Sequence, residues 1–556
     1  MRRMSAPDAA ARALSDRFLA DSVISRIWDR DISVWGAAPG SADATSIQSR
    51  LGWLDVGKTM AAELDRVVSF AEAAVGEEIA AVYLLGMGGS SLCAEVLRAV
   101  NGVAAGYPEL FVLDTTDETA VVNAAARLDP AKTLFLVSSK SGGTVEVASL
   151  EKFFWAHMAR ALGRDPGRHF VAITDPGTAL QTLAQSKRYR DVFINPADIG
   201  GRFSALSLFG LVPCALLGAD PAGLLDAGAT MAEGCRQENH ANAGLELGAF
   251  IGAAAAAGRD KLTVVLPRSL ASLGLWIEQL VAESTGKHGK GALPIVDEPL
   301  GRPDEYGRDR AFVAVSSDRD EPDHARLRAL EAAGHPVLRL STRLDGLGAE
   351  FFRWEFATAV AGAALGINPF DDPNVAEAKE KTKALLSSYA STGTLPEPTA
   401  AAAAHGLATF SPTFSGGTPD IVVTASLRSL KAGDYVAMLS YLPASSDVET
   451  RISEIRAGIR ARHHVGSTFG VGPRYLHSTG QYHKGGPNTA LAIVITGEDA
   501  TRTDIPGAGY SFSVLKRAQA LGDVETLAAH GRRVVRVHVA DATMQELESL
   551  FAQALR

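Results

Sequence analysis

From about Ile79 onward, short apolar runs of β type alternate with amphipathic stretches of helical spacing, and this alternation constrains the fold more than any other feature. Strands that alternate with helices pair into parallel sheets covered by helices on both faces. The sequence therefore predicts an α/β protein. The first series of predicted strands fits one doubly wound parallel sheet, with strands ending at Leu85, Leu113, Ser138, Thr174 and Asn195.

A second series of predicted strands ends at Pro267, Val296, Ser316 and Ser341. A chain of 556 residues is too long for a single core, and domains of about 100–200 residues predict about three units. We expect an N-terminal helical segment over 1–75, a first domain over 76–220, a second over 221–390, a small-residue and proline-bearing linker over 391–404, and an α/β extension over 405–556.

The composition excludes several classes of protein. The most apolar stretch, residues 247–258, is short of the ~20 residues that span a bilayer. Arg2 and Arg3 are followed by Asp8 instead of an apolar leader segment, which favours the cytoplasm. A net charge of −9 disfavours nucleic acid as a partner. An anionic small substrate remains compatible with this charge if cations gather in a cleft.

Cysteine usage predicts neither a disulfide framework nor a thiolate metal site. The three cysteines, Cys93, Cys214 and Cys235, are widely spaced and form no C-x-x-C pair.

Residues 52–59 match the P-loop pattern formally, but we do not interpret them as a nucleotide site. The interior of this segment holds Trp53 and Asp55, which suit phosphate poorly, and no strand-like run precedes it.

The segment GMGGSS, residues 86–91, directly follows a predicted strand and opens a helix. Glycine lets the backbone approach a phosphate, and amides and hydroxyls at a helix start bind it, so Gly88, Gly89 and Ser90 are candidate ligands. The alternative is a dinucleotide site that uses Asp114. Against it, Ser91 stands where the dinucleotide fingerprint has its third glycine.

A second hydroxyl-rich loop, SSKSGGTVE, follows the third predicted strand at residues 138–146. It offers the side chains of Ser139, Lys140, Ser141 and Thr144. Because loops at neighbouring carboxyl ends of a parallel sheet converge on one crevice, the two loops together predict a pocket for a single phosphate group.

Two charged residues are candidates for the chemistry. Arg202 follows a Gly-Gly pair in DIGGRFS and would present a fixed cation to a developing enediolate. Glu298 follows the predicted strand that ends at Val296, at the carboxyl end of a sheet where catalytic groups commonly lie.

Taken together, GMGGSS, SKSGGT, DIGGRFS and the ESTGK segment at 283–287 followed by PIVDEP resemble the glucose-6-phosphate isomerase family, which is built from two sugar-isomerase (SIS) domains. The resemblance runs from about Leu51 to Ser388. It implies two flavodoxin-like parallel-sheet domains and an aldose–ketose isomerase of glucose 6-phosphate and fructose 6-phosphate. Neither a cofactor nor a metal would be needed, and a homodimer is expected.

The resemblance also implies roles for individual residues. Ser90, Ser139, Ser141 and Thr144 would contact the phosphate, with Lys140 nearby. Arg202 would stabilise the cis-enediolate while Glu298 moves a proton between C1 and C2.

The segment NPFDDPNVAEAK, from Asn368, is similar to the family's lysine signature and would place Lys379 in the site. Asp372, Asn374 and Ala376 depart from that signature. The family's ring-opening histidine has no clear counterpart in AEFFRWEF, from Ala349.

Some alternatives stay open within the resemblance. His288 is a substitute for the missing histidine or a solvated side chain, and Glu305 is a second candidate carboxylate. Residues after Ser391 resemble the carboxyl-terminal extension of fused transaldolase–glucose-6-phosphate isomerase proteins. There, GPRYLHSTGQYHKGGPN, with His477 and Gln481, is either an anion-binding loop that reaches a neighbouring active site or an interface loop.

Three functions remain at this stage. The first is the isomerase, with mannose 6-phosphate as a further possible substrate. The second is a weakly catalytic or non-catalytic protein that senses sugar phosphates, favoured by the altered lysine signature and the missing histidine. The third is a nicotinamide dehydrogenase, which the second phosphate loop opposes.

Overall fold

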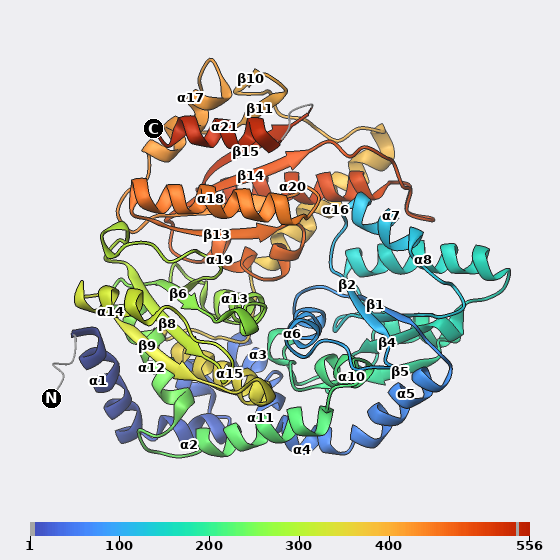
Figure 1. Cartoon of the computed structure of the whole chain (residues 1–556), viewed down its shortest axis with the longest axis horizontal. Coiled ribbons are helices and arrows are strands. Elements are labelled where there is room, and N and C mark those ends of the chain that lie inside the picture. The colour runs from blue at the N-terminus through green and yellow to red at the C-terminus, as the bar shows by residue number, and fades with distance from the viewer. Residues whose placement is uncertain (1–5, 541–543) are drawn as a thin grey trace.

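The computed structural model describes residues 6–540 and 544–556 (Figure 1). Arg2 and Arg3, used above to argue against a leader, lie outside the described residues. The chain begins with helices that pack beneath both following units: α1 (Ala6–Ala20), α2 (Val23–Trp28), α3 (Ala42–Gln48), α4 (Val56–Ala61) and α5 (Leu64–Gly76). The P-loop match falls on a 3₁₀ turn and α4, with no strand before it, so the helical interpretation is confirmed.

The first sheet has the strand order β2-β1-β3-β4-β5, all parallel, which is the flavodoxin-like order. Its strands are β1 (Ala81–Leu85), β2 (Glu109–Leu113), β3 (Thr133–Ser138), β4 (Phe170–Thr174) and β5 (Asp191–Ile194). The helices of this unit are α6 (Leu92–Asn101), α7 (Glu118–Ala126), α8 (Val145–Leu162), α9 (Ala179–Ser186) and α10 (Leu208–Leu216).

Successive side chains of these strands bury against opposite cores because a strand alternates its faces. Val82 and Leu84 belong to the core shared with the N-terminal helices, whereas Tyr83 and Leu85 belong to the core beneath α8. A strand buried on both faces consists of a continuous run of apolar residues, so these strands could be predicted from the sequence.

The second sheet repeats this topology with the parallel order β7-β6-β8-β9. Its strands are β6 (Lys261–Val265), β7 (Leu293–Ile295), β8 (Arg310–Ser316) and β9 (Val337–Ser341). Its helices are α11 (Pro221–Cys235), α12 (Ala243–Ala256), α13 (Leu273–Thr285), α14 (His324–Ala332), α15 (Leu347–Leu365) and α16 (Val375–Thr392).

The third sheet has the order β10-β11-β15-β14-β12-β13, in which β12 to β15 run parallel and β10 and β11 are antiparallel additions. Its strands are β10 (Ala402–Ala404), β11 (Leu407–Phe410), β12 (Tyr435–Ser440), β13 (Gly466–Val471), β14 (Ala490–Gly497) and β15 (Arg533–Val539). Its helices are α17 (Pro419–Arg428), α18 (Ser446–His463), α19 (Gly480–Gly485), α20 (Phe512–Ala529) and α21 (Met544–Ala554).

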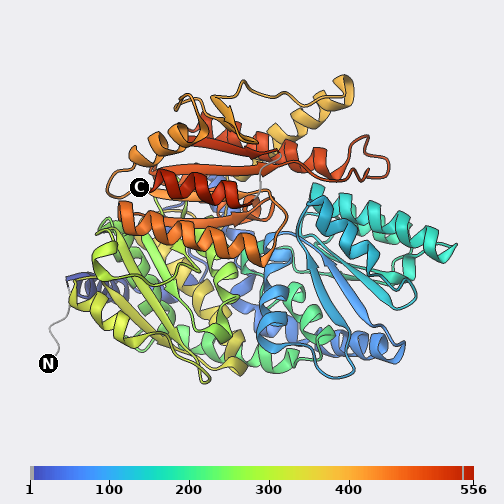
Figure 2. The same cartoon turned by 45° about the horizontal axis from the view of Figure 1, so that its top comes forward.

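The predicted fold class, two doubly wound parallel-sheet domains and a C-terminal α/β unit, is confirmed. Figures 1 and 2 show the C-terminal unit lying across the other two, with α18 above the second sheet and α20 beside α16. The unit boundaries stay predictions. Within the predicted linker, α16 continues to Thr392 and the last residues form β10. No helix of the described chain is long and apolar enough to cross a bilayer.

Close helix packing beneath the second sheet depends on small residues, which gives a prediction for stability. A Cβ on Gly248 of α12 would lie 2.5 Å from the carbonyl oxygen of Ala357 in α15. We expect Gly248→Ala to lower the free energy of unfolding by about 1–3 kcal/mol through overpacking, measured by urea denaturation. Gly234→Ala, on α11 with open space around its Cβ, is the matched control and should be neutral or stabilising. Equal effects of the two variants would contradict this packing argument.

Candidate active site

The glycine-serine loop after β1 contacts two segments that are distant in sequence. A Cβ on Gly89 would lie 2.0 Å from the carbonyl oxygen of Gly201, and one on Gly88 would lie 2.7 Å from the carbonyl oxygen of His477. Gly88 also has a φ of 55°, in the left-handed region that favours glycine. Glycine at both positions therefore lets the loop touch the Arg202 segment and the C-terminal unit at once.

The second predicted phosphate loop lies beside the first, as its position at a neighbouring strand end requires. The hydroxyl of Ser138 donates to the carbonyl oxygen of Ser90 at 2.7 Å. The hydroxyl oxygens of Ser139 and Thr144 are 3.1 Å apart. Thr144 directly precedes α8 and makes no capping bond with its side chain, so its hydroxyl and the start of α8 can face an anion together.

Lys140 and Ser141 complete this loop. The ammonium of Lys140 is paired with Asp175 and donates to the carbonyl oxygen of Ala197 at 3.1 Å, which fastens the loop to the strand end before Arg202. Ser141 is exposed. The structure thus brings the predicted phosphate-binding residues of both loops to one edge of the first sheet.

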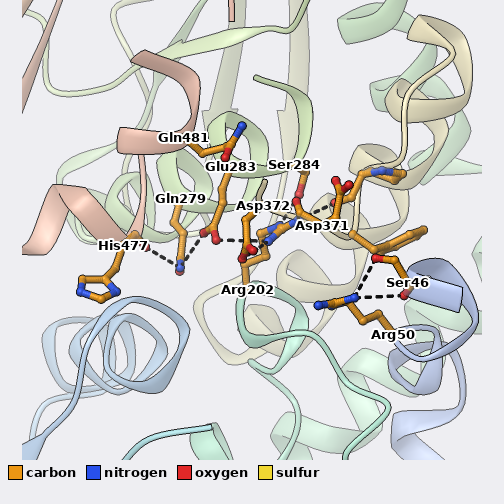
Figure 3. A network of polar contacts seen from close by, with 12 residues as sticks. Ser46, Arg50, Arg202, Gln279, Glu283, Ser284, Asp371, Asp372, His477 and Gln481 are labelled. Carbon is orange, nitrogen blue, oxygen red and sulfur yellow. Dashed lines mark hydrogen bonds and ion pairs between the residues drawn. The ribbon is translucent and has the colours of Figure 1, made fainter. Parts of the chain in front are cut away.

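Arg202 is buried, and acceptors surround its guanidinium (Figure 3). Its Nε donates to the hydroxyl of Ser284 at 2.7 Å. Its Nη2 donates to the carbonyl oxygens of Pro369 and Asp371 at 2.8 and 2.7 Å. Its Nη1 lies 3.2 Å from the carboxylate of Glu283. A cation from the first domain is therefore fixed against the second domain and against the segment that leads to α16.

Glu283, on α13, is the carboxylate nearest to that cation. Burial raises the pKa of Glu283 to about 7, although the charge of Arg202 acts in the opposite direction. The amide of Gln279 donates to the carboxylate of Glu283 at 3.1 Å, and the same amide donates to the carbonyl oxygen of His477 at 2.8 Å. A carboxyl group that titrates near neutral pH can both accept and return a proton.

The neighbouring cation Lys287 holds the segment before α16. Its fully buried ammonium donates to the carbonyl oxygen of Asn368 at 2.8 Å and to the carboxylate of Asp371 at 2.5 Å. Burial lowers the pKa of Lys287 to about 8, and the charge of Arg202 acts in the same direction. Lys287 and Arg202 together position the segment from which α16 starts.

The structure places Glu298 elsewhere, and this corrects the assignment made from the sequence. Its side chain is fully buried, forms an ion pair with Arg310, and lies 3.8 Å from the guanidinium of Arg460. In this structure the carboxylate of Glu298 has no exposed surface and faces two arginines instead of the residues around Arg202. Glu305, the second candidate, is paired with Arg460 as well, so both carboxylates belong to the contact between the second domain and α18.

The loop after β13, which carries His477, belongs to the site of its own chain. The imidazole Nε2 of His477 lies 2.9 Å from the carboxylate of Glu146, at the start of α8. Burial alone would raise the pKa of Glu146, but the charge of His477 and its hydrogen bond lower that pKa below its ordinary value. Gln519 of α20 donates to the same carboxylate at 2.7 Å, so the carboxylate that holds the imidazole is itself fixed in position.

Gln481 connects this loop to two other parts of the site. Its amide donates to the carbonyl oxygen of Gly286 at 2.9 Å, directly after α13. Its side-chain oxygen accepts from the backbone amide of Asn374 at 2.9 Å, directly before α16. The C-terminal unit therefore holds α13 and α16 in their relative positions.

A cavity of about 570 Å³ opens between α8, α16 and the His477 loop. Its lining includes Thr144, Glu146, Lys379, His477 and Gln519. Lys379 is exposed and close enough to Glu146 for its charge to lower the pKa of that carboxyl. The departures from the family's lysine signature therefore do not remove Lys379 from the site.

Sequence reasoning missed Glu283 as a candidate for proton transfer and left His477 unassigned. The sequence offered a signal for Glu283, because this residue opens the ESTGK segment that contributed to the resemblance. His477 carried a weaker signal, since nothing in the sequence relates it to Glu146, 331 positions away. His288, the proposed substitute histidine, is exposed.

Comparisons with known proteins show which family this chain resembles in sequence and fold. The family model for phosphoglucose isomerase matches residues 54–299. A probable glucose-6-phosphate isomerase of Natronomonas pharaonis is 30% identical over 355 residues, covering 57% of this chain and 81% of that protein. A glucose-6-phosphate isomerase of Rubrobacter xylanophilus is 29% identical, with 54% and 81% covered. The crystal structure of a glucose-6-phosphate isomerase from Chlamydia trachomatis has the same fold, with a TM-score of 0.56 at 19% identity, over 68% of this chain and 86% of that one.

Paired flavodoxin-like sheets, with the two predicted phosphate-binding loops at one sheet edge and a match to the phosphoglucose isomerase model, place the chain in the sugar-isomerase class. More specifically, the chain belongs to the glucose-6-phosphate isomerase family, since it covers most of a relative that is 30% identical to it.

Proposed function

We propose that this chain interconverts glucose 6-phosphate and fructose 6-phosphate by proton transfer through an enediol. The observation that carries the proposal is the position of Glu283. It is a buried carboxyl with a pKa near 7, 3.2 Å from the guanidinium of Arg202 and linked through Gln279 to the His477 loop. The activity is also the one named for the relatives described above.

The phosphate of the substrate binds at the two loops of the first sheet. Ser90, Ser139, Ser141 and Thr144 supply hydroxyls, and the start of α8 supplies backbone amides and the positive end of a helix dipole. Lys140 adds a positive charge nearby. This leaves the sugar between the phosphate loops and α13.

Proton transfer falls to Glu283 in place of Glu298. As a carboxylate, Glu283 removes the proton from the carbon next to the carbonyl group and then returns it to the adjacent carbon. The negative charge that develops on the enediolate oxygens is stabilised by Arg202, whose position other acceptors fix before the reaction begins.

Ring opening precedes proton transfer and needs a proton donor and acceptor at the ring oxygen and the anomeric hydroxyl. His477 and Lys379 line the cavity that continues from the phosphate loop, so they are our candidates for this step. Glu146 acts on His477 as a positioning residue, because it holds one imidazole nitrogen.

The sensing interpretation loses support from this arrangement. It relied on a missing histidine and an altered lysine signature, whereas His477 and Lys379 line one cavity. The dehydrogenase interpretation required Asp114 to bind a ribose. Asp114 instead pairs with Arg474 through two bonds of 2.6 and 2.8 Å.

We also propose that the protein acts in the cytoplasm as a homodimer and does not bind nucleic acid. The buried free thiols of Cys93, Cys214 and Cys235 support a reducing compartment. The net charge of −9 opposes nucleic-acid binding. The dimer follows from family membership, and light scattering after size-exclusion chromatography should give about twice the mass of 58.3 kDa. A single-chain mass would contradict it.

The role of Glu283 can be separated from that of Glu298 by two matched variants. In an assay coupled to glucose-6-phosphate dehydrogenase, we expect Glu283→Gln to lower kcat with fructose 6-phosphate by roughly 10²-fold or more, because the proton acceptor is lost. Glu298→Gln leaves Arg310 without its partner, so it should lower stability by about 3–5 kcal/mol while the folded enzyme keeps its turnover.

Glu278→Gln is the control for a change on the same helix. Burial raises the pKa of Glu278 to about 8, so this carboxyl is largely neutral at pH 7 and glutamine should replace it without loss. Full activity of Glu283→Gln, with Glu298→Gln inactive but folded, would restore the assignment made from the sequence.

The pH dependence of the rate gives a further prediction. Because burial raises the pKa of Glu283 to about 7 and only its ionised form accepts a proton, kcat/KM should fall as pH decreases through 7. The slope should approach about tenfold per pH unit. The substrate phosphate titrates at about 6, so a midpoint near 7 distinguishes the enzyme group from the substrate. An acid limb with its midpoint near pH 4.5 would exclude Glu283 as the base.

A further inference from the structure

A second large cavity lies in the C-terminal unit, away from the isomerase site. It has a volume of about 650 Å³, which is in the range of small-molecule sites, and none of its lining residues lines the cavity at Lys379. Its walls come from the ends of β12 and β14, from the first half of α20, and from the end of α16.

The position of this cavity in the fold is the one at which parallel sheets bind ligands. The chain passes from β12 to its neighbour β13 and then returns to β14 on the other side of β12, so the strand order reverses between β12 and β14. Tyr441, which follows β12, and Gly497, the last residue of β14, both line the cavity. In the first sheet the corresponding strands, β1 and β3, carry the two phosphate loops.

The charges around the cavity favour an anion at one end. Arg517 donates to the carboxylate of Glu397 at 2.6 Å, and Arg536 pairs with the other oxygen of the same carboxylate. Two guanidinium groups therefore share one negative charge. The Nε atom of Arg536 is buried and has no hydrogen-bond partner among the described residues. The other buried cation, Lys516, is already held by Asp117 and Asp499.

Glu397 lies in the segment between α16 and β10, outside regular secondary structure, and a third of its side chain is exposed. Its carboxylate occupies the donors that an incoming phosphate would use. Arginine pairs bind phosphate through bidentate, charge-assisted hydrogen bonds, so a phosphate group can replace the carboxylate without loss of donors.

We propose that this cavity is a second binding site, specific for a phosphorylated small molecule whose phosphate takes the place of Glu397 between Arg517 and Arg536. The body of the ligand extends toward the ends of β12 and β14. This inference concerns a cavity separate from the isomerase site and does not depend on the isomerase activity.

Calorimetric titration of the full chain with ADP and with fructose 1,6-bisphosphate tests the proposal, since both probes carry phosphate on different bodies. Glu397→Gln frees both arginines and should strengthen binding of the preferred probe by about tenfold. Arg517→Gln should weaken it by about tenfold. Arg428→Gln, an exposed arginine of α17 outside the cavity, is the matched control and should change nothing.

Arg517 and Glu397 are partly exposed, with 42% and 33% of their side chains accessible, so we expect Arg517→Gln to fold like the wild type. Glu397→Gln leaves the buried Arg536 without its carboxylate and should lower stability, so its folded fraction is checked by thermal unfolding before the titration. Opposite changes in the two variants with either probe support the site, and the probe that shows them identifies the body of the ligand. Equal affinities of the wild type, Glu397→Gln and Arg517→Gln for both probes would overturn the proposal. The isomerase assay, unchanged in both variants, separates this result from any failure at the catalytic site.

Discussion

The buried guanidinium of Arg202 is the contact on which the arrangement of the site depends. It comes from the first domain, and its acceptors come from α13 of the second domain and from the segment before α16. A buried charge must be paired and hydrogen-bonded, so these segments cannot separate without leaving the cation unsatisfied. The same requirement places Glu283 beside Arg202 and away from water, where burial raises its pKa to about 7. Burial therefore has two effects here: it ties the domains together through Arg202, and it raises the pKa of Glu283.

The C-terminal unit completes the site and is not an appendage to it. His477 contacts Glu146 of the first domain, and Gln481 contacts Gly286 and Asn374 of the second. The close approach of Gly88 to the carbonyl oxygen of His477 adds a steric constraint to these hydrogen bonds. The unit that provides this loop also contains, by our inference, a cavity of its own, and α20 lies between the two: Arg517 faces the second cavity while Gln519 holds Glu146.

The phosphate loops could be predicted because they are local. Each is a short run of glycine and hydroxyl residues after a buried strand, and the carboxyl ends of neighbouring strands must meet. The choice between two candidate carboxyl groups could not be made from local patterns alone. Both Glu283 and Glu298 stand near the ends of regular elements, and only the environment distinguishes them: Glu298 has Arg310 as a buried partner, whereas Glu283 faces Arg202 and the His477 loop. A local sequence pattern does not show which side chain from another part of the chain will lie beside a given residue.

The sequence by itself determined the α/β class, the strands, the phosphate loops and the resemblance to glucose-6-phosphate isomerases, because periodicity, glycine placement and short motifs are properties of neighbouring residues. Only the tertiary structure decided which carboxyl group lies beside Arg202, that His477 of the C-terminal unit contacts Glu146, and that Glu397 lies between two arginines. These features depend on burial and on contacts between residues that are distant in the sequence, and such contacts exist only once the sheets have packed together.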